Sequence, residues 1–396
     1  MSSLWLCVVW GAFMRWVFSL AVAALLLSPI SAAARPATPA IEAGVEEAMK
    51  STGAKGLALA VVEDGKVAYV RTFGDRNAKG EPLTPETVMY GASLTKAVFA
   101  YTVLQLVDEG VIALDTPISR YLAKPLPAYI GFGDDYAPYE TLTDERWRQI
   151  TPRMLLTHGA GFSNFYGDNP GEKLVIHFDP GSRYAYSGDG MILLQFVLEK
   201  GLGLDLGKEI QRRVFNRFGM KNTAMIWRPD FAANLADGWD EAGRPEPHDE
   251  RSRVRAAGSM DTTIEDFARF SAAVIRGDGL SPAARAEMVR ASLPITTRSQ
   301  FRTLQPELPP EQRRKDLAAG LGVVVFSGPQ GQGFLKGGHN DTTANTWVCV
   351  EKGKRCVVIL SNDVRAEKAF PVLVRTALGV TGAPYEWEYG FAPNAP

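Results

Sequence analysis

The chain has 396 residues, of which 46% are hydrophobic and 22% charged, so it is long enough to bury a large core and to form more than one domain. Its 43 basic and 44 acidic residues nearly cancel, which argues against nucleic acid or an anionic membrane surface as a partner. A small-molecule or peptide partner is expected instead.

The first part of the chain differs in character from the rest. An apolar run over residues 16–27 follows a basic residue and leads into small residues at 31–34, the pattern of a secretory signal with its cleavage site. We expect residues 1–34 to be a signal peptide, and the mature protein to be periplasmic or secreted from a bacterium without stable membrane association. A retained membrane anchor is the alternative. Either Met1 or Met14 can be the true start.

Strands of a sheet are predicted near both ends of the chain. Residues 57–62 and 67–70 are rich in β-formers and flank a turn at Asp64-Gly65, which indicates a hairpin. Near the other end, β-rich runs alternate with glycine turns before a segment with helical spacing at 365–378. These runs cover residues 321–326, 334–336, 346–350 and 356–360.

A long section with helical periodicity lies between these strands, notably at residues 94–109 and 190–201. We predict an α/β (α+β) fold, with an antiparallel sheet flanked by helices, built from both chain ends, and an inserted, mainly helical domain. The sheet domain would comprise residues 35–92 and 316–396, and the helical domain residues 93–315. A cleft between them is the expected place for a site.

Two cysteines, Cys349 and Cys356, remain once the predicted signal is removed. They flank a predicted two-residue turn at Lys352-Gly353, which would set them opposite each other on neighbouring strands. That count makes them a hydrogen-bonded pair, a geometry that suits a disulfide less well. A disulfide and two buried free thiols both remain open, with the thiols favoured.

The tetrad Ser93-Leu94-Thr95-Lys96 is the most informative motif of the chain. Lys96 falls one helical turn after Ser93 on the same face, so its amine can reach the hydroxyl. A lysine can activate a serine only when burial or a neighbouring cation lowers its pKa, and Lys336 can supply that cation. Tyr186, between two ammonium groups, is a second candidate base. The sequence does not choose between Lys96, Tyr186 and the coupled pair.

An acyl-transfer site also needs donors for a developing oxyanion. The amide of Ser93 lies at the start of a predicted helix, where backbone amides have no partner within the helix. The amide of His339 is the second candidate, because Gly337 and Gly338 before it let a substrate approach the backbone closely.

These residues carry a resemblance: the chain resembles the serine β-lactamase-related superfamily, nearest the branch of class C β-lactamases, D-Ala-D-Ala carboxypeptidases and family VIII esterases. The resemblance implies Ser93 as nucleophile, Lys96 and Tyr186 as acid and base, and Lys336 as an electrostatic and carboxylate-binding group. It also implies an oxyanion hole formed by the amides of Ser93 and His339. Besides the tetrad, the matching motifs are Leu155 to Gly161, Asp179-Pro180-Gly181 leading to Tyr186-Ser187, Phe218-Gly219-Met220, Gly258-Ser259-Met260, and the helix at Asp266-Phe267.

The chain departs from the pattern of class C β-lactamases at two predicted substrate-binding positions. Gly188 replaces the asparagine of Tyr-x-Asn, and Gly337 replaces a threonine. Gly338, which follows Gly337, is the third predicted substrate-binding residue. Both changes remove a side-chain contact to a substrate. We therefore expect a secreted serine hydrolase that forms an acyl-enzyme on Ser93 and hydrolyses a carboxylic ester or a D-amino-acid peptide. A class C-like β-lactamase is one alternative, and a non-catalytic protein that binds cell-wall peptides or penicillin is another.

Other residue types give no competing site. The scattered histidines show no metal spacing, so we expect neither a metal nor a cofactor. The Gly-x-Ser-x-Gly motif of α/β-hydrolases is absent from the sequence. We interpret His158 as a structural residue that fixes a glycine-rich loop. A monomer is expected, although the sequence does not determine the oligomeric state.

Overall fold

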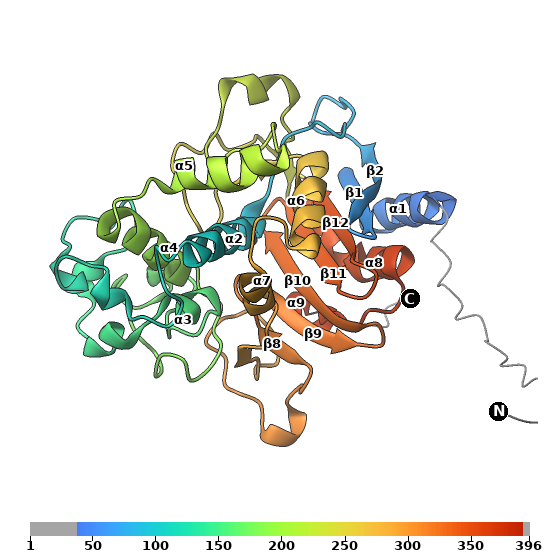
Figure 1. The fold of residues 1–396 in the computed structure, drawn as a ribbon. Helices are drawn as coiled ribbons and strands as arrows, with labels where there is room; N and C mark the ends of the chain where they lie inside the picture. The colour runs from blue at the N-terminus through green and yellow to red at the C-terminus, as the bar shows by residue number, and fades with distance from the viewer. Residues whose placement is uncertain (1–37, 391–396) are drawn as a thin grey trace, which may run out of the picture. The chain divides into compact units, whose positions relative to one another are not determined.

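The protein is described by a computed structural model that covers residues 38–390 (Figure 1). The predicted signal peptide, residues 1–34, lies outside the described residues. An eight-stranded antiparallel sheet has the strand order β2-β1-β12-β11-β10-β9-β8-β7, so strands from both ends of the chain are neighbours in it. The strands are β1 (Gly56–Glu63), β2 (Lys66–Gly74), β7 (Leu293–Pro294), β8 (Leu317–Ala319), β9 (Val324–Gly328), β10 (Gly331–His339), β11 (Ala344–Val350) and β12 (Arg355–Ser361).

Both faces of the sheet are covered by helices. Strand β1 is buried over nearly its whole length, and its side chains alternate between two cores because successive residues of a strand point to opposite faces. Leu57 and Leu59 pack with helices α1 (Thr38–Thr52) and α8 (Phe370–Leu378) on one face, while the residues between them face α6 (Ile264–Arg276) on the other. The predicted fold class, an antiparallel sheet flanked by helices, is confirmed.

The middle of the chain is mainly helical, as predicted. Helix α2 (Thr95–Asp108) is buried on all sides over its first three turns, so it forms the centre of this part of the molecule (Figure 1).

No helix within residues 38–390 is both long enough and apolar enough to cross a membrane. The proposed boundaries between a sheet domain and a helical domain stay predictions. The other helices are α3 (Pro152–Leu156), α4 (Gly188–Phe196), α5 (Leu206–Ile210), α7 (Pro282–Met288) and α9 (Tyr385–Tyr389), and the short strands are β3 (Met89–Tyr90), β4 (Gly238–Trp239), β5 (Pro245–Glu246) and β6 (Asp261–Thr262).

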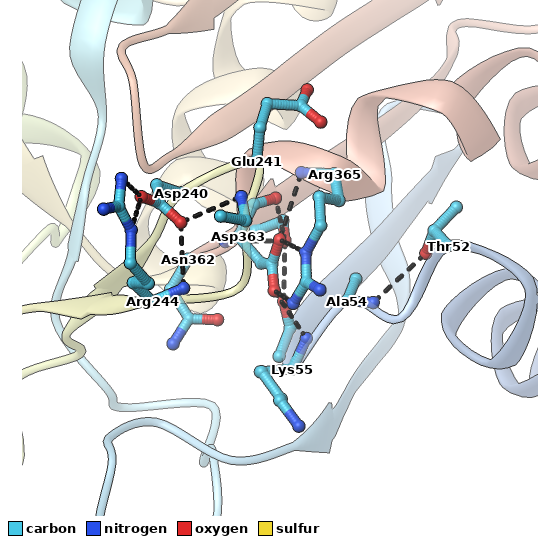
Figure 2. A network of polar contacts seen from close by, with 12 residues as sticks. Thr52, Ala54, Lys55, Asp240, Glu241, Arg244, Asn362, Asp363 and Arg365 are labelled. Atoms are coloured by element: carbon cyan, nitrogen blue, oxygen red, sulfur yellow. Dashed lines mark hydrogen bonds and ion pairs between the residues drawn. The ribbon is translucent and has the colours of Figure 1, made fainter.

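The first and last strands of the chain, β1 and β12, are joined by a buried carboxylate, that of Asp363, directly after β12. Its Oδ2 atom accepts a hydrogen bond from the backbone amide of Lys55, just before β1, at 2.9 Å. The guanidinium of Arg365 pairs with both carboxylate oxygens, at 2.6 and 2.9 Å (Figure 2). The carboxylate therefore links the start of β1 to the end of β12 through its hydrogen bond with Lys55, while Arg365 compensates its charge.

The hairpin of β11 and β12 carries a disulfide between Cys349 and Cys356. The preference for free thiols was therefore wrong. The strands end at Val350 and resume at Arg355, so four residues form the turn where two were expected. The two Cα atoms lie 4.1 Å apart, close to the ~4.5 Å of a non-hydrogen-bonded pair and well below the ~5.5 Å of a hydrogen-bonded one. Such a closely spaced pair is within the reach of a disulfide.

Candidate active site

A cavity of about 600 Å³ lies where the start of α2 meets strand β10. It brings together seven of the eight residues that the sequence singled out. Gly188 is the exception: Tyr186 and Asp189 line the cavity, whereas Gly188 does not. The seven are Ser93, Lys96, Tyr186, Lys336, Gly337, Gly338 and His339.

Ser93 lies in a single 3₁₀ turn, Ala92–Leu94, that leads into α2. Ala92 has φ +46°, a left-handed conformation that costs free energy in any residue except glycine. The carbonyl of Ala92 accepts a hydrogen bond from Thr95 Oγ1 at 2.6 Å, and the amide of Gly91 donates to Met260 O at 2.8 Å. These bonds fix the turn, so Thr95 of the tetrad has a structural part within the motif.

Lys96 is buried directly beside the serine. Its Nζ atom is 2.9 Å from Ser93 Oγ and also donates a hydrogen bond to the carbonyl of Ala257 at 2.5 Å. The side chain is only 1% exposed. Burial lowers the pKa of Lys96 well below its usual value, and the positive charge of Lys336 lowers it further. The structure therefore meets the condition under which a lysine can accept a proton from serine.

Tyr186 faces Ser93 from the N-terminal end of α4. Its hydroxyl forms a hydrogen bond with the side chain of Ser93, and its ring centroid is 4.9 Å from Lys96 Nζ and 5.3 Å from Lys336 Nζ. Burial raises the pKa of Tyr186, and the bond from Ser93 lowers it by less. The effect of burial is the larger of the two, so the resting site favours the neutral phenol although Tyr186 lies between the amines of Lys96 and Lys336.

His158 supports Tyr186 from behind, in line with the structural interpretation. Its ring lies 4.5 Å from the Tyr186 ring, and its Nδ1 atom accepts a hydrogen bond from the amide of Ser187 at 3.1 Å. Burial, followed by the charges of Lys96 and Lys336, lowers the pKa of His158, so the ring is held as a neutral acceptor.

The second half of β10 forms the opposite wall. Strand β9 pairs with β10 only as far as Leu335, so on that side residues 336–339 are not paired with β9. A Cβ on Gly338 would lie 2.9 Å from the amide nitrogen of Leu94 and 3.0 Å from that of Ser93. Only glycine lets the strand approach the start of α2 this closely, which brings the two predicted oxyanion donors to the same cavity.

The side chains of Lys336 and His339 differ in their partners. Burial lowers the pKa of Lys336 to about 8. The Nδ1 atom of His339 is 3.2 Å from Glu367 Oε2, and this hydrogen bond raises the pKa of the imidazole. Because His339 is directed toward Glu367, the predicted contribution of its backbone amide is more compatible with the geometry than catalysis by its ring.

Among the cavity residues that were not singled out from the sequence, three bear on the chemistry of the site: Asn164, Asp189 and Glu388. The Oδ1 atom of Asn164 accepts a hydrogen bond from the amide of Gly188 at 3.0 Å, so a side-chain amide does line the cavity next to the position where Gly188 lacks one. A Cβ on Gly188 would lie only 2.5 Å from the ring of Phe165, which explains the glycine. No pattern in the sequence connects Asn164 with Gly188, because only the fold brings them together.

The other two are buried carboxylic acids. Burial raises the pKa of Asp189 to about 7, and it also raises the pKa of Glu388. Asp189 directly follows Gly188, whereas Glu388 belongs to the short helix α9 near the C-terminal end of the described chain. Among the described residues, no group of three or more histidine, cysteine or acidic side chains is arranged to hold a metal ion.

Comparison with known proteins gives consistent results. The pattern of the family described as "Beta-lactamase" matches residues 41–379. The chain is 26% identical to esterase EstB of Burkholderia gladioli over 354 residues, 82% of this chain and 85% of the esterase. It is 29% identical to lovastatin esterase of Penicillium rubens over 201 residues, 44% of this chain, but spans only 49% of that enzyme.

A solved structure shows the same fold. The D-alanine carboxypeptidase AmpC from Burkholderia cenocepacia matches with a TM-score of 0.64 at 18% identity, over 86% of this chain and 96% of that protein. At this level of identity the likeness concerns the fold alone. The family match, in contrast, covers most of the chain and contains the serine, lysine and tyrosine that the cavity brings together. The chain belongs to the beta-lactamase family, as the resemblance predicted.

Proposed function

We propose that the protein is a serine hydrolase that forms an acyl-enzyme on Ser93 and releases it with water, without a cofactor. The observation that carries this proposal is the buried amine of Lys96, 2.9 Å from Ser93 Oγ, with the Tyr186 hydroxyl bonded to the same serine. A nucleophile, a base with a lowered pKa and a second proton carrier are the parts that acyl transfer through serine requires.

In the proposed reaction, Ser93 Oγ attacks the carbonyl carbon of the substrate while its proton passes to neutral Lys96. The amides of Ser93 and His339 donate to the oxyanion of the tetrahedral intermediate. The carbon–oxygen bond to the leaving group then breaks, and the leaving alkoxide takes a proton from Lys96 through the hydroxyl of Tyr186. Water adds to the acyl-enzyme by the reverse route, giving a carboxylic acid and free Ser93.

We assign the base to Lys96 because of the electrostatics of the site. Burial and Lys336 favour the unprotonated amine of Lys96, while burial favours the protonated phenol of Tyr186. In the resting site Lys96 can therefore accept a proton and Tyr186 can pass one on.

We propose a carboxylic ester as the first substrate class to test, ahead of a D-amino-acid peptide or a β-lactam. The name of EstB, which aligns over most of both chains, and that of lovastatin esterase support this choice. A D-amino-acid peptide remains a candidate because D-alanine carboxypeptidase shares the fold.

The test compares the protein and its Ser93→Ala variant in the turnover of p-nitrophenyl butyrate. We expect the variant to lose at least about 10³-fold in kcat, because the nucleophile is removed and only binding and the oxyanion donors remain. A Ser93→Ala protein that keeps its activity would refute the assignment. Intact mass spectrometry with an acylating probe gives a second readout, since the label should appear only when Ser93 is present. Labelling by penicillin without turnover would instead favour the non-catalytic, penicillin-binding alternative.

We also propose that the protein is exported and acts as a monomer in the periplasm or outside the cell. Cell fractionation with amino-terminal sequencing of the exported form tests the signal peptide, which predicts a start near Arg35. Size-exclusion chromatography with light scattering tests the monomer.

A further inference from the structure

A carboxylate from the C-terminal end of the described chain enters the wall of the cavity. Glu388, on α9, lines the cavity together with Lys336, Gly337 and Gln300. The residue is only 6% exposed, and its Oε2 atom has no hydrogen-bond partner among the residues that the structure covers. A buried carboxylate is costly unless other groups compensate its charge, so its position next to a substrate cavity calls for an explanation.

Gly337 makes the room that Glu388 occupies. A Cβ atom on Gly337 would lie 2.1 Å from Glu388 Oε1, so any side chain at position 337 would clash with the carboxylate. The absence of a side chain at Gly337 on β10 is therefore matched by the presence of the Glu388 side chain in the same space. The carboxylate of Glu388 stands where that side chain would project.

The charged groups around Glu388 are arranged so that Lys336 compensates it. Burial has the largest effect on the pKa of Glu388 and raises it. Lys336 has the next largest effect and lowers this pKa, followed by His339 and the hydrogen bond with Gln300. The charge of Glu367 raises it. In return, Glu388 raises the pKa of Lys336 against the effect of burial. Glu388 is thus an acidic group that acts on Lys336 from the same wall of the cavity.

The second cation on the cavity wall is also engaged. Arg255 donates hydrogen bonds to the backbone carbonyls of Asp134 and Asp135, in the rim of the cavity. A ligand carboxylate that approaches Lys336 would also meet the carboxylate of Glu388, which lines the same cavity. Two carboxylates close together in a poorly solvated site repel each other strongly.

We propose that Glu388 is a specificity-determining residue: by occupying the space beside Gly337 and balancing Lys336, it makes the site select neutral acyl substrates over those that carry a carboxylate near the reacting bond. This inference rests on the proposed function, because it names the substrate class of that same site. It also gives a common reason for Gly337 and Glu388, which are far apart in the sequence: the glycine leaves the space that the carboxylate occupies.

The test measures binding and does not depend on turnover. Two esters of the same shape, meta-(phenylacetoxy)benzoate and its neutral benzamide analogue, are titrated by calorimetry into Ser93→Ala and Ser93→Ala/Glu388→Gln proteins near neutral pH. Glu388→Gln keeps the size of the side chain and removes the charge. The matched control is Glu386→Gln in the Ser93→Ala background, which removes an exposed carboxylate from the same helix.

We expect Glu388→Gln to tighten binding of the benzoate at least about tenfold relative to the benzamide, since a tenfold change needs only ~1.4 kcal/mol of removed repulsion. Glu386→Gln should change that ratio by less than about twofold, because an exposed charge is screened by water and salt. Glu388→Ala should repeat the change in ratio, and thermal melts monitored by circular dichroism establish that each variant is folded.

An unchanged ratio in the Glu388 variants would overturn the proposal and leave Glu388 as an anchor for α9. Equal tightening of both esters, or no binding of either one, would overturn it as well. The hydrolase assignment is judged separately by turnover of the neutral ester with Ser93 intact. Turnover that depends on Ser93 without a change in ratio defeats only the inference about Glu388, whereas a change in ratio without turnover defeats only the assignment of a hydrolase.

Discussion

At the scale of single residues, the proposed chemistry depends on one serine and two side chains that contact it. Lys96 and Tyr186 both contact Ser93, and both are buried, but burial has opposite consequences for them. It favours the neutral amine of the lysine, which can accept a proton, and the neutral phenol of the tyrosine, which can donate one. Burial, together with the charge of Lys336, therefore supports the proposed division of roles between the two residues.

Replacement of Tyr186 by phenylalanine tests its part in proton transfer. We expect Tyr186→Phe to lower kcat by about 10² to 10⁴, the usual contribution of a positioned acid or base. The matched control is Tyr184→Phe, which removes a buried hydroxyl that donates to Gln300 at 3.0 Å. Steady-state kinetics should show a much smaller loss in this control. Comparable losses in both variants would indicate that buried hydroxyls support the fold here and that proton transfer does not depend on Tyr186.

The pH dependence follows from Lys336. Its pKa is lowered to about 8, so it is protonated below this pH and loses its charge as the pH rises through it. The loss removes the smaller of the two effects that lower the pKa of Lys96, the larger being burial, so a greater fraction of Lys96 is protonated and kcat/KM for a neutral ester should fall above about pH 8. Lys336→Arg, which stays charged, should move this decline to higher pH in a pH–rate profile. A decline at the same pH in that variant would assign it to another group.

At the scale of elements, the hairpin of β11 and β12 shows how a turn decides a covalent bond. A turn of four residues, in place of two, brings Cys349 and Cys356 into a closely spaced pair. The order of β-rich runs and the helical periodicity of the chain predicted the elements themselves. The length of one turn was not predictable to the residue, and the bond depends on it.

Removal of this disulfide should weaken the fold but not the chemistry. The cross-link closes a short loop, with a sequence separation of 7, and loop closure of this size corresponds to about 2 kcal/mol in the chain-entropy account. We expect the Cys349→Ala/Cys356→Ala variant to lose about this much unfolding free energy in urea titrations, while kcat stays unchanged because neither cysteine lines the cavity. An equal stability of both proteins in the oxidised state would show that the bridge adds no net constraint.

At the scale of the whole molecule, the sheet is complete only when strands from both ends of the chain pair with each other. Strand β1 pairs with β12, and the carboxylate of Asp363 links the residue before β1 to Arg365 after β12 (Figure 2). Strands β10 and β11 belong to the same sheet, so the wall of the cavity depends on this closure.

Asp363→Ala should therefore destabilise the whole protein. Asp363 is fully buried, and removal of one member of a buried ion pair leaves the other charge uncompensated, at a cost of about 3 kcal/mol. Asp240→Ala, in the loop beside it, removes a carboxylate whose partner Arg244 is exposed (Figure 2), and should cost clearly less. Chemical denaturation of both variants makes the comparison. Equal losses would mean that Asp363 does not connect the two chain ends energetically.

The sequence by itself determined the features that depend on local geometry and on the order of motifs. Ser93 and Lys96 lie one helical turn apart, so their contact follows from the helix alone. Runs of β-forming residues between turns predicted the strands, and the ordered motifs from Ser93 to Gly338 indicated the family. Only the tertiary structure decided which segments distant in sequence share the cavity. Asn164 beside Gly188 and Glu388 beside Gly337 meet through packing of separate elements, and no periodicity in a sequence encodes such a meeting.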